Sequence, residues 1–459
     1  MTGSSDGDTN ACAHCGAARR PDDRFCSACG EPVGGCAACA FDRPTDRFCH
    51  ACGRPRRQQT SDGPLAGLRV LDIGNMLAGP FCSRVLADFG AEVIKVELPQ
   101  GDPIRGWRAQ YQGESLFWAV LARNKRPIVL DLRTEEGRTT LRDLAATADI
   151  IVENFRPGTI ERWGLDYESL ARVNPGLILV RISGYGQTGP YSDRAGFASV
   201  AEGMGGLMHL TGHPDRPPAR SGVSLADTVA GLYGAFGAMM AALDRQNSGR
   251  GQVVDVALTD TVISLLDDNV LAADALGMVR GRFGAGIEGI APTNVYPTRD
   301  GRWAVIGANS DSLFARLAGV LGRPEWLEDE RYVKSLPRAS HQIELDEKIA
   351  AETSRYDIED LLARLTEAGI PCGPVYTSAD ILKDPHFNER GSIIPVLLEG
   401  SSKVVRQPGI VPRLTRTPGK VRHGGKPIGA DTEAVLADLR PAGSTEHPER
   451  PASIPPTDH

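Results

Sequence analysis

The chain has 459 residues, 41% of them hydrophobic, and a formal net charge of -7. This length allows two or three domains, and this apolar content is enough for a buried core. The acidic balance argues against non-specific nucleic-acid binding, so an anionic ligand must be met by a local cluster of cations.

The N-terminal ten residues are polar and acidic and lack the charged-then-apolar profile of a signal peptide, so we expect a cytoplasmic protein. The apolar helix candidate Ala230–Leu243 is too short and too rich in Gly and Ala for a membrane span. We therefore expect no contact with a membrane.

Four Cys-x2-Cys pairs follow the polar start. Each pair lets two thiolates reach one tetrahedral ion, and four thiolates hold a zinc ion with no open position. Because segments 23–30 and 46–53 are nearly identical, residues 12–53 resemble a tandem zinc ribbon with two structural zinc ions. Four disulfides are the weaker interpretation in a reducing cytosol. The predicted ligands are Cys12, Cys15, Cys26, Cys29, Cys36, Cys39, Cys49 and Cys52.

Residues 54–63 form a linker that is basic and then polar, and the main domain begins after it. The segment Leu68–Ile73 is typical of a strand, Gly74–Gly79 of a loop, and Ala91–Glu97 of the next strand. A strand, glycine loop, helix and strand in succession predict a βαβ unit and a parallel sheet. Since the loop lacks the Gly-x-Gly-x-x-Gly spacing, it does not support a nicotinamide or flavin cofactor.

Further alternation extends this α/β pattern as far as residue 255. Strands are predicted at Pro127–Asp131, at Asp149–Glu153 and from Leu177, with a helix near Glu135–Ala146. We assign residues 64–255 and about 395–440 to one large α/β domain, to which the chain returns near Val404–Leu414.

Beyond Asp255 the pattern changes to helical spacing over Leu258–Leu276, followed by a glycine-rich loop at Gly281–Gly289. The dipeptide Asp300-Gly301 between apolar runs predicts a hairpin. We assign residues 256–394 to a connecting helix and a smaller α+β domain, with helices over 312–321 and 358–368. The Pro-, Glu- and Ser-rich residues 441–459 are predicted to be a disordered tail.

Three segments carry a resemblance to a known family. Residues 183–190 are Ser-Gly-Tyr-Gly-Gln-Thr-Gly-Pro, residues 193–197 are Asp-Arg-Ala-Gly-Phe, and residues 249–256 are Gly-Arg-Gly-Gln-Val-Val-Asp-Val. From Pro64 to Gly429 the chain resembles the class III CoA-transferases, the family of formyl-CoA transferase, carnitine CoA-transferase and α-methylacyl-CoA racemase. The resemblance implies a Rossmann-like large domain, a smaller α+β domain and two interlocked chains.

The resemblance also implies a site for coenzyme A (CoA), at the carboxyl ends of strands and in the loops after them. CoA carries phosphates and an adenine, so its site needs cations, backbone N–H donors and apolar cover. The positions that match the family's CoA site are Met76, Leu77, Ala78, Lys125, Asn154, Phe155, Arg162 and Tyr185.

The family's chemistry is covalent, because an aspartate attacks the acyl-CoA. The resemblance places that aspartate directly after Gly196-Phe197, where this chain has Ala198. Glu202 lies one helical turn further on, and its side chain leans toward the helix N-terminus, so we predict Glu202 as the replacement nucleophile. The competing interpretation is a surface or capping residue that interacts with the helix dipole. Asp227 is interpreted as an N-terminal cap or first-turn residue of a helix or, if buried near the interface, as a residue that organises the site.

The leading prediction is therefore an enzyme that moves CoA from an acyl-CoA donor to a carboxylic acid acceptor through an enzyme-bound acyl intermediate. The alternative is a CoA-binding subunit without the nucleophile, which acts as structural or regulatory partner of an active homologous chain. In that role the zinc ribbon would dock a protein partner, whereas nucleic-acid binding is a minority interpretation. Homodimer and heterodimer both stay open, and the sequence does not identify the donor or the acceptor.

Overall fold

The computed structural model describes residues 63–439. The predicted zinc ribbon at 12–53, the linker up to residue 62 and the predicted tail at 441–459 lie outside the described residues. The chain divides into two units between Asp62 and Gly63, and the second unit, which holds every described residue, is described by itself.

The large sheet has six parallel strands in the order β5-β2-β1-β6-β7-β8. The predicted parallel sheet is thereby confirmed. The strand order reverses between β1 and β6, and such a switch point is where open α/β sheets bind ligands. The strands are β1 (Arg69–Asp72), β2 (Glu92–Glu97), β5 (Lys125–Val129), β6 (Ile150–Glu153), β7 (Ile178–Ser183) and β8 (Val253–Ala257).

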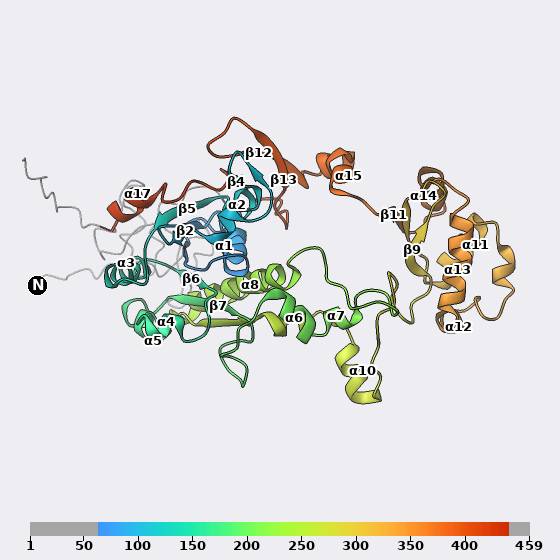
Figure 1. Ribbon diagram of the computed structural model, residues 1–459, viewed down its shortest axis with the longest axis horizontal. Coiled ribbons are helices and arrows are strands. Elements are labelled where there is room, and N and C mark those ends of the chain that lie inside the picture. Colours follow the sequence, from blue (N-terminus) through green and yellow to red (C-terminus); the bar gives the residue numbers. More distant parts are fainter. Residues whose placement is uncertain (1–62, 440–459) are drawn as a thin grey trace, which may run out of the picture. The chain divides into compact units, whose positions relative to one another are not determined.

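Alternate side chains of these strands enter two cores, one on each face of the sheet. Helices lie on both sides of this sheet (Figure 1). On one face Val70 and Val180 pack with α1 and α8, while on the other Leu71 and Leu179 pack with α3 and α5. Burial on both faces explains why these strands are nearly continuous apolar runs. The helices are α1 (Ala78–Asp88), α3 (Glu135–Ala145), α4 (Thr159–Arg162), α5 (Tyr167–Val173) and α8 (Leu225–Ser248).

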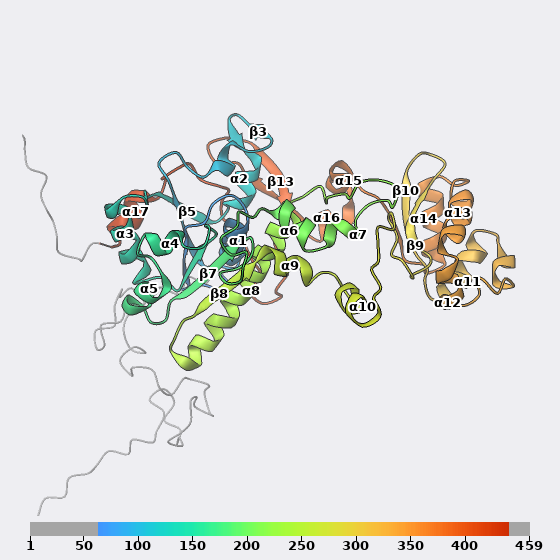
Figure 2. The ribbon, with the colours of Figure 1, turned by 60° about the horizontal axis from the view of Figure 1, so that its bottom comes forward.

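Helix α8 has 24 residues and extends well beyond the predicted segment Ala230–Leu243. By length and composition alone it could cross a membrane. In the fold it lies along β7 and β8 and against α1 (Figure 2). A β-carbon on Gly237 would lie 2.5 Å from Cγ1 of Val254, so the small residues of α8 serve its close packing on the sheet.

The smaller domain has a core of its own, which includes Tyr296, Phe314 and Leu345. Its antiparallel sheet has the order β11-β10-β9, and the predicted hairpin at Asp300-Gly301 is confirmed by the pairing of β9 with β10. The elements are β9 (Thr293–Pro297), β10 (Trp303–Gly307), β11 (Cys372–Pro374), α11 (Asp311–Val320), α12 (Ser335–Ser340), α13 (Gln342–Thr353) and α14 (Ile358–Glu367).

The predicted helical segment Leu258–Leu276 forms two helices, α9 (Leu258–Ile263) and α10 (Asn269–Leu276). Between them Asp267 has a φ of 48°, a left-handed conformation that a continuous helix does not allow. The apolar spacing alone did not reveal this interruption.

The C-terminal part contacts the segment before β5. The buried Arg123 donates to Asp88 and to the Pro408 carbonyl (2.7 Å), and Asn124 donates to the Lys420 carbonyl (2.8 Å). The remaining elements are β3 (Gln110–Tyr111), β4 (Glu114–Ser115), α2 (Leu116–Leu121), α6 (Ala198–Met204), α7 (Leu207–Leu210), α15 (Ser378–Lys383), α16 (Pro385–Glu389), β12 (Ile393–Leu397), β13 (Val404–Pro408) and α17 (Thr432–Ala437).

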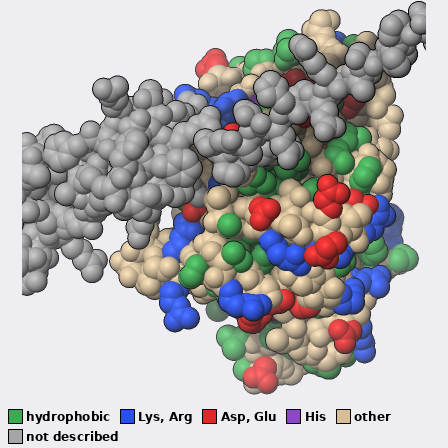
Figure 3. All heavy atoms as spheres, turned by 90° about the vertical axis from the view of Figure 1, so that its left-hand side faces the viewer, with side chains coloured by type: hydrophobic (Ala, Val, Ile, Leu, Met, Phe, Trp, Pro, Cys, Tyr) green, Lys and Arg blue, Asp and Glu red, His purple; other side chains and the backbone are tan. Residues whose placement is uncertain are grey.

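On the face shown in Figure 3, acidic and basic side chains of the described residues are interspersed. Exposed ion pairs such as Arg133 with Asp131 and Arg138 with Glu135 contribute to this mixture in the molecule. Neither sign gathers into a broad patch among the described side chains visible on this face.

Candidate functional site

A cleft opens at the carboxyl ends of the central strands, where the strand order reverses. Its cavity volume is about 250 Å³, and the cleft opens to solvent. Residues from the loops after β1, β2, β5 and β6 line it, among them Gly74, Asn75, Gln100, Arg133, Phe155 and Trp163.

The loop after β1 is held rigidly at one wall of this cleft. Asn154 donates to the Asn75 carbonyl (2.8 Å) and accepts from the Asn75 N–H (2.8 Å). Met76 has a φ of 61° and its N–H is held by Asp102 at 3.1 Å. A β-carbon on Gly74 would lie 2.7 Å from Asn154 Oδ1, so glycine is required for this packing. The predicted residues Asn154 and Met76 thus shape the wall, and the strained backbone of Met76 is typical of a functional loop.

Lys125 lies away from the cleft, although the resemblance placed it in the CoA site. Its ammonium group is buried and donates to Asp72 (2.9 Å) and to the Pro80 carbonyl (2.6 Å). Lys95 pairs with Asp102 at 3.2 Å from the neighbouring strand, and burial lowers the pKa of Lys125. Lys125 on β5 therefore links β1, through Asp72, to the start of α1, through the Pro80 carbonyl. This geometry does not support direct contact with CoA.

The other predicted CoA residues divide into buried and accessible groups. The side chains of Leu77 and Ala78 are buried in the cores, so α1 offers a ligand only its backbone N–H groups there. Phe155 lines the cleft and packs edge-on against Trp163, with ring centroids 5.2 Å apart. Arg162, the residue before Trp163, is exposed.

Arg133 lines the cleft but was absent from the sequence prediction. Its guanidinium is more than half exposed and pairs with Asp131 at 2.7 Å. Arg133 is the first cationic residue after the predicted strand Pro127–Asp131. Its position just beyond the carboxyl end of a strand could have identified it, because ligands of open α/β sheets bind there.

A second cluster brings together Glu202 on α6, Arg220 on the segment before α8, and Asp227 in the first turn of α8. Glu202 is only 1% exposed, and its two oxygens accept from Arg220 Nε (3.1 Å) and Nη2 (3.2 Å). Burial and the Glu202 charge raise the pKa of Asp227 to about 6, against the opposing effect of Arg220. These three side chains therefore act on one another electrostatically.

Asp227 is the more suitable nucleophile of the two carboxylates. Glu202 is enclosed and held at both oxygens, whereas no side chain among residues 63–439 hydrogen-bonds the half-buried Asp227. Asp227 lies in the first turn of α8, one of the two positions expected for it, and Ser224 is the N-cap residue. The assignment of Glu202 stays a prediction that this geometry does not favour.

The predicted residue Tyr185 is not among the residues that line the cleft, and it contacts the end of α6 instead. Its hydroxyl lies 3.3 Å from Sδ of Met204, at the end of α6. Its ring packs edge-on against Tyr191, with centroids 5.9 Å apart. The role predicted for Tyr185 in CoA binding stays a prediction.

The first loop connects the cleft to the carboxylate cluster. Gly74 and Asn75 line the cleft at one end of the loop, and the Ala78 carbonyl meets α8 at Gly231 beyond the other end. Gly231 follows Asp227 by one helical turn on the same face. A long ligand seated in the cleft could therefore extend along the loop toward Asp227.

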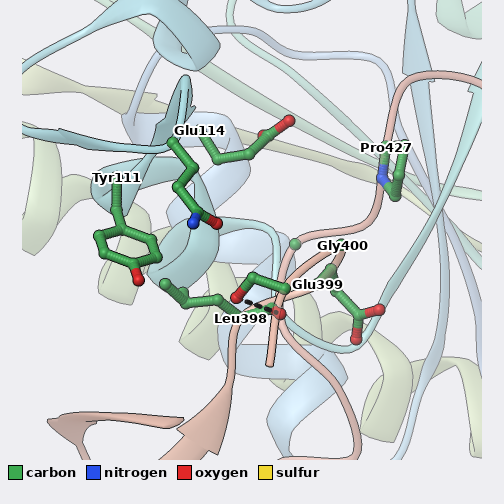
Figure 4. Close-up of a pocket in the computed structure, with 9 residues that line it drawn as sticks. Tyr111, Glu114, Leu398, Glu399, Gly400 and Pro427 are labelled. Carbon is green, nitrogen blue, oxygen red and sulfur yellow. Dashed lines mark hydrogen bonds between the residues drawn. The ribbon is translucent and has the colours of Figure 1, made fainter. Parts of the chain in front are cut away.

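A different hollow lies between the β3–β4 hairpin and the loop after β12, lined by Tyr111, Glu114, Leu398, Glu399 and Gly400 (Figure 4). Two carboxylates on its walls disfavour an anionic ligand such as CoA. Within residues 63–439, no group of three or more His, Cys, Asp and Glu side chains is arranged to hold a metal ion.

Comparisons with known proteins agree with a CoA site. The model of CoA-transferase family III matches residues 65–432. The chain is 48% identical to succinyl-CoA–D-citramalate CoA-transferase of Chloroflexus aurantiacus, over 82% of this chain and 94% of that protein. It is 40% identical to the alpha subunit of succinyl-CoA–L-malate CoA-transferase of Chloroflexus aurantiacus, over 82% and 89%. A crystal structure of a CAIB/BAIF family protein from Brucella suis is similar, with TM-score 0.74, 37% identity and coverage of 83% and 100%.

Proposed function

The chain belongs to CoA-transferase family III and transfers CoA from an acyl-CoA to a carboxylic acid, and we propose that Asp227 carries the acyl group. The observation that carries this assignment is a half-buried carboxylate without a hydrogen-bonding side chain among residues 63–439, one turn before the contact of α8 with the cleft loop. Since the two relatives act on succinyl-CoA with D-citramalate or L-malate, we propose succinyl-CoA as donor and a hydroxydicarboxylate as acceptor.

The reaction needs one carboxylate and no outside reactant. An Asp227 oxygen attacks the thioester carbonyl, the C–S bond breaks, and a mixed anhydride and CoA thiolate form. The thiolate attacks the Asp227 carbonyl carbon, so the donor acid leaves as a carboxylate and Asp227 becomes a CoA thioester. The acceptor carboxylate attacks this thioester and expels the thiolate, which then attacks the acceptor carbonyl and restores the Asp227 carboxylate. Protons balance, and the free energy of the thioester is conserved.

The cleft suits the nucleotide end of CoA. Arg133 offers a guanidinium to a phosphate, and Phe155 with Trp163 offers an aromatic wall to the adenine. The start of α1 has no capping side chain, so its N–H groups can meet phosphate oxygens. The thiol arm of CoA would then follow the loop from Gly74 to Ala78 toward Asp227.

Trapping of the acyl-enzyme distinguishes Asp227 from Glu202. The purified chain is incubated with succinyl-CoA, treated with hydroxylamine or borohydride, and mapped by mass spectrometry. We expect modification of Asp227 in the wild type and in Glu202→Gln, and none in Asp227→Asn. Modification of Glu202 would return the nucleophile to that residue. Absence of any modified carboxylate, with CoA still bound, would favour the alternative of a CoA-binding subunit that partners an active homologue.

We further propose that the chain works as a dimer with a second copy or with a homologous chain. The outer face of α8 exposes Leu232 (46%), Phe236 (60%), Met240 (53%) and Leu243 (63%), and a monomer rarely leaves such an apolar stripe in water. One relative is named as an alpha subunit, so a heterodimer is as open as a homodimer.

The N-terminal cysteines support a separate proposal. We propose that residues 12–53 bind two zinc ions in a tandem ribbon that docks a protein partner, on the basis of the cysteine spacing alone. With the family's activity on small acids and acyl-CoA, we expect the chain to act in the cytoplasm.

A further inference from the structure

One edge of the Arg220 guanidinium group is bound within the carboxylate cluster, and the other edge is open. Its Nε and Nη2 atoms donate to the enclosed Glu202, while Nη1 has no hydrogen-bond partner in the part of the chain that the structure describes. The Arg220 side chain is 42% exposed, compared with 1% for that of Glu202. The inner edge of the guanidinium is therefore fixed, and its outer edge can receive another anion.

The charges of this cluster change during the proposed reaction. With Asp227 and Glu202 ionised and Arg220 protonated, the three groups sum to one negative charge. Conversion of Asp227 to a thioester removes its charge, so the remaining pair is neutral. A free carboxylate is repelled by the first state and tolerated by the second, because like charges at close range raise the free energy of a partly desolvated site.

Resting on the proposed function, we propose that the outer edge of Arg220 binds the reacting carboxylate of the acceptor, and that Glu202 restricts this binding to the acylated enzyme. Arg220 is suited to this because a guanidinium can hold carboxylates on two edges at once. Glu202 is then a positioning residue, since it acts through Arg220.

The first test removes the ion pair as a unit. Removal of Arg220 alone would leave Glu202 buried without a partner and could unfold the protein. The double variant Glu202→Gln/Arg220→Gln avoids that charge and keeps two amides that can hydrogen-bond. We expect succinyl-CoA alone still to modify Asp227, whereas the KM for L-malate rises about tenfold or more. Arg216→Gln, an exposed arginine in the same segment, is the matched control and should leave the KM unchanged.

The second test changes only the charge of Glu202. In the free Glu202→Gln enzyme, the negative charge of Asp227 and the positive charge of Arg220 cancel. L-malate should therefore bind before acylation. We expect L-malate to become a competitive inhibitor against succinyl-CoA, at concentrations that do not inhibit the wild type. An unchanged inhibition pattern would overturn the role given to Glu202.

The outcomes separate this inference from the proposed function. If wild-type protein is not modified on Asp227, the proposed nucleophile is wrong. If Asp227 is modified in the double variant but the KM for L-malate equals that of the wild type, the nucleophile stands and Arg220 is not the acceptor site. Circular dichroism and thermal melting of each variant confirm that a changed KM does not come from unfolding.

Discussion

Gly231 of α8 lies so close to the start of α1 that a β-carbon on Gly231 would stand 2.8 Å from the Ala78 carbonyl oxygen. Ala78 follows the loop that walls the cleft, and Gly231 lies one turn beyond Asp227. This contact joins the helix that carries the proposed nucleophile to the helix that follows the cleft loop.

Replacement of Gly231 by alanine should therefore impair the enzyme. Alanine normally stabilises a helix interior by about 1 kcal/mol over glycine, but here the methyl group must displace the α1 backbone. We expect Gly231→Ala to lower the melting temperature and, because a 1 Å misplacement can slow a reaction about 100-fold, to lower kcat strongly. Gly319→Ala in α11 is the control, because nothing lies within 4 Å of its β-carbon position. Equal melting temperatures and equal kcat values for the two variants would contradict the requirement for close approach of α8 to α1 at Gly231.

The pH dependence of acylation should report Asp227. Burial and Glu202 raise its pKa to about 6, and only the ionised carboxylate attacks the thioester. We expect kcat/KM for succinyl-CoA to be constant well above this pKa and to fall about tenfold per pH unit below it. Because Glu202 raises the pKa, Glu202→Gln should move the midpoint to lower pH. A wild-type midpoint near the ordinary aspartate value would show that this carboxylate is not the titrating group.

The sheet and the position of the cleft were accessible from the sequence because they depend on local patterns. Apolar runs of strand length, glycine loops and intervening helices predicted the parallel sheet, and the predicted CoA residue Phe155 lies in the loop after β6, where it lines the cleft. The assignment of Lys125 stays a prediction that its buried ion pair with Asp72 does not favour, because such a pair and a contact with an anionic ligand require the same residue type.

The carboxylate cluster was harder to predict. Its members come from α6, the segment before α8 and α8 itself, so their proximity depends on packing that no local pattern encodes. Asp227 in a first helical turn favoured a capping interpretation, and Arg220 lies in a polar segment that resembles an ordinary loop. From the sequence we therefore predicted Glu202 as the nucleophile, a role that its enclosed position does not favour.

The buried position of Lys125 predicts a defect in stability rather than in ligand binding. Lys125→Met leaves Asp72 with the more distant Lys95 at 3.8 Å, and loss of one partner of a buried ion pair costs about 3–5 kcal/mol. Denaturant unfolding should show this loss, while the folded variant binds CoA with unchanged affinity. Arg126→Met, at the next and more exposed position, should lose less stability. A large loss of CoA affinity in stable Lys125→Met would restore Lys125 to the CoA site.

Metal analysis of the full chain tests the cysteine array. We expect two zinc ions per chain, because each group of four thiolates closes one tetrahedral site. Cys26→Ser/Cys29→Ser should bind less zinc, whereas Cys372→Ser, outside the array, should retain both ions. Zinc content near zero in freshly purified, reduced protein would contradict the ribbon.

Arg133 provides the last test, because it separates CoA recognition from chemistry. It lines the cleft far along the chain from Asp227, so Arg133→Gln should weaken binding of the phosphate end without changing the modified residue. We expect the KM for succinyl-CoA to rise about tenfold with kcat nearly unchanged, since a lost charge-assisted hydrogen bond to phosphate acts equally on ground and transition states. The KM for succinyl-CoA should also depend less on salt concentration in this variant, because one fewer cation interacts with the phosphates and is screened by salt. Arg142→Gln, an arginine of α3 that pairs with Glu135, should behave as the wild type. If Arg133→Gln and Arg142→Gln gave the same KM, the phosphates would have to bind elsewhere in the cleft. The proposed path of CoA along residues 74–78 to Asp227 would then no longer be supported.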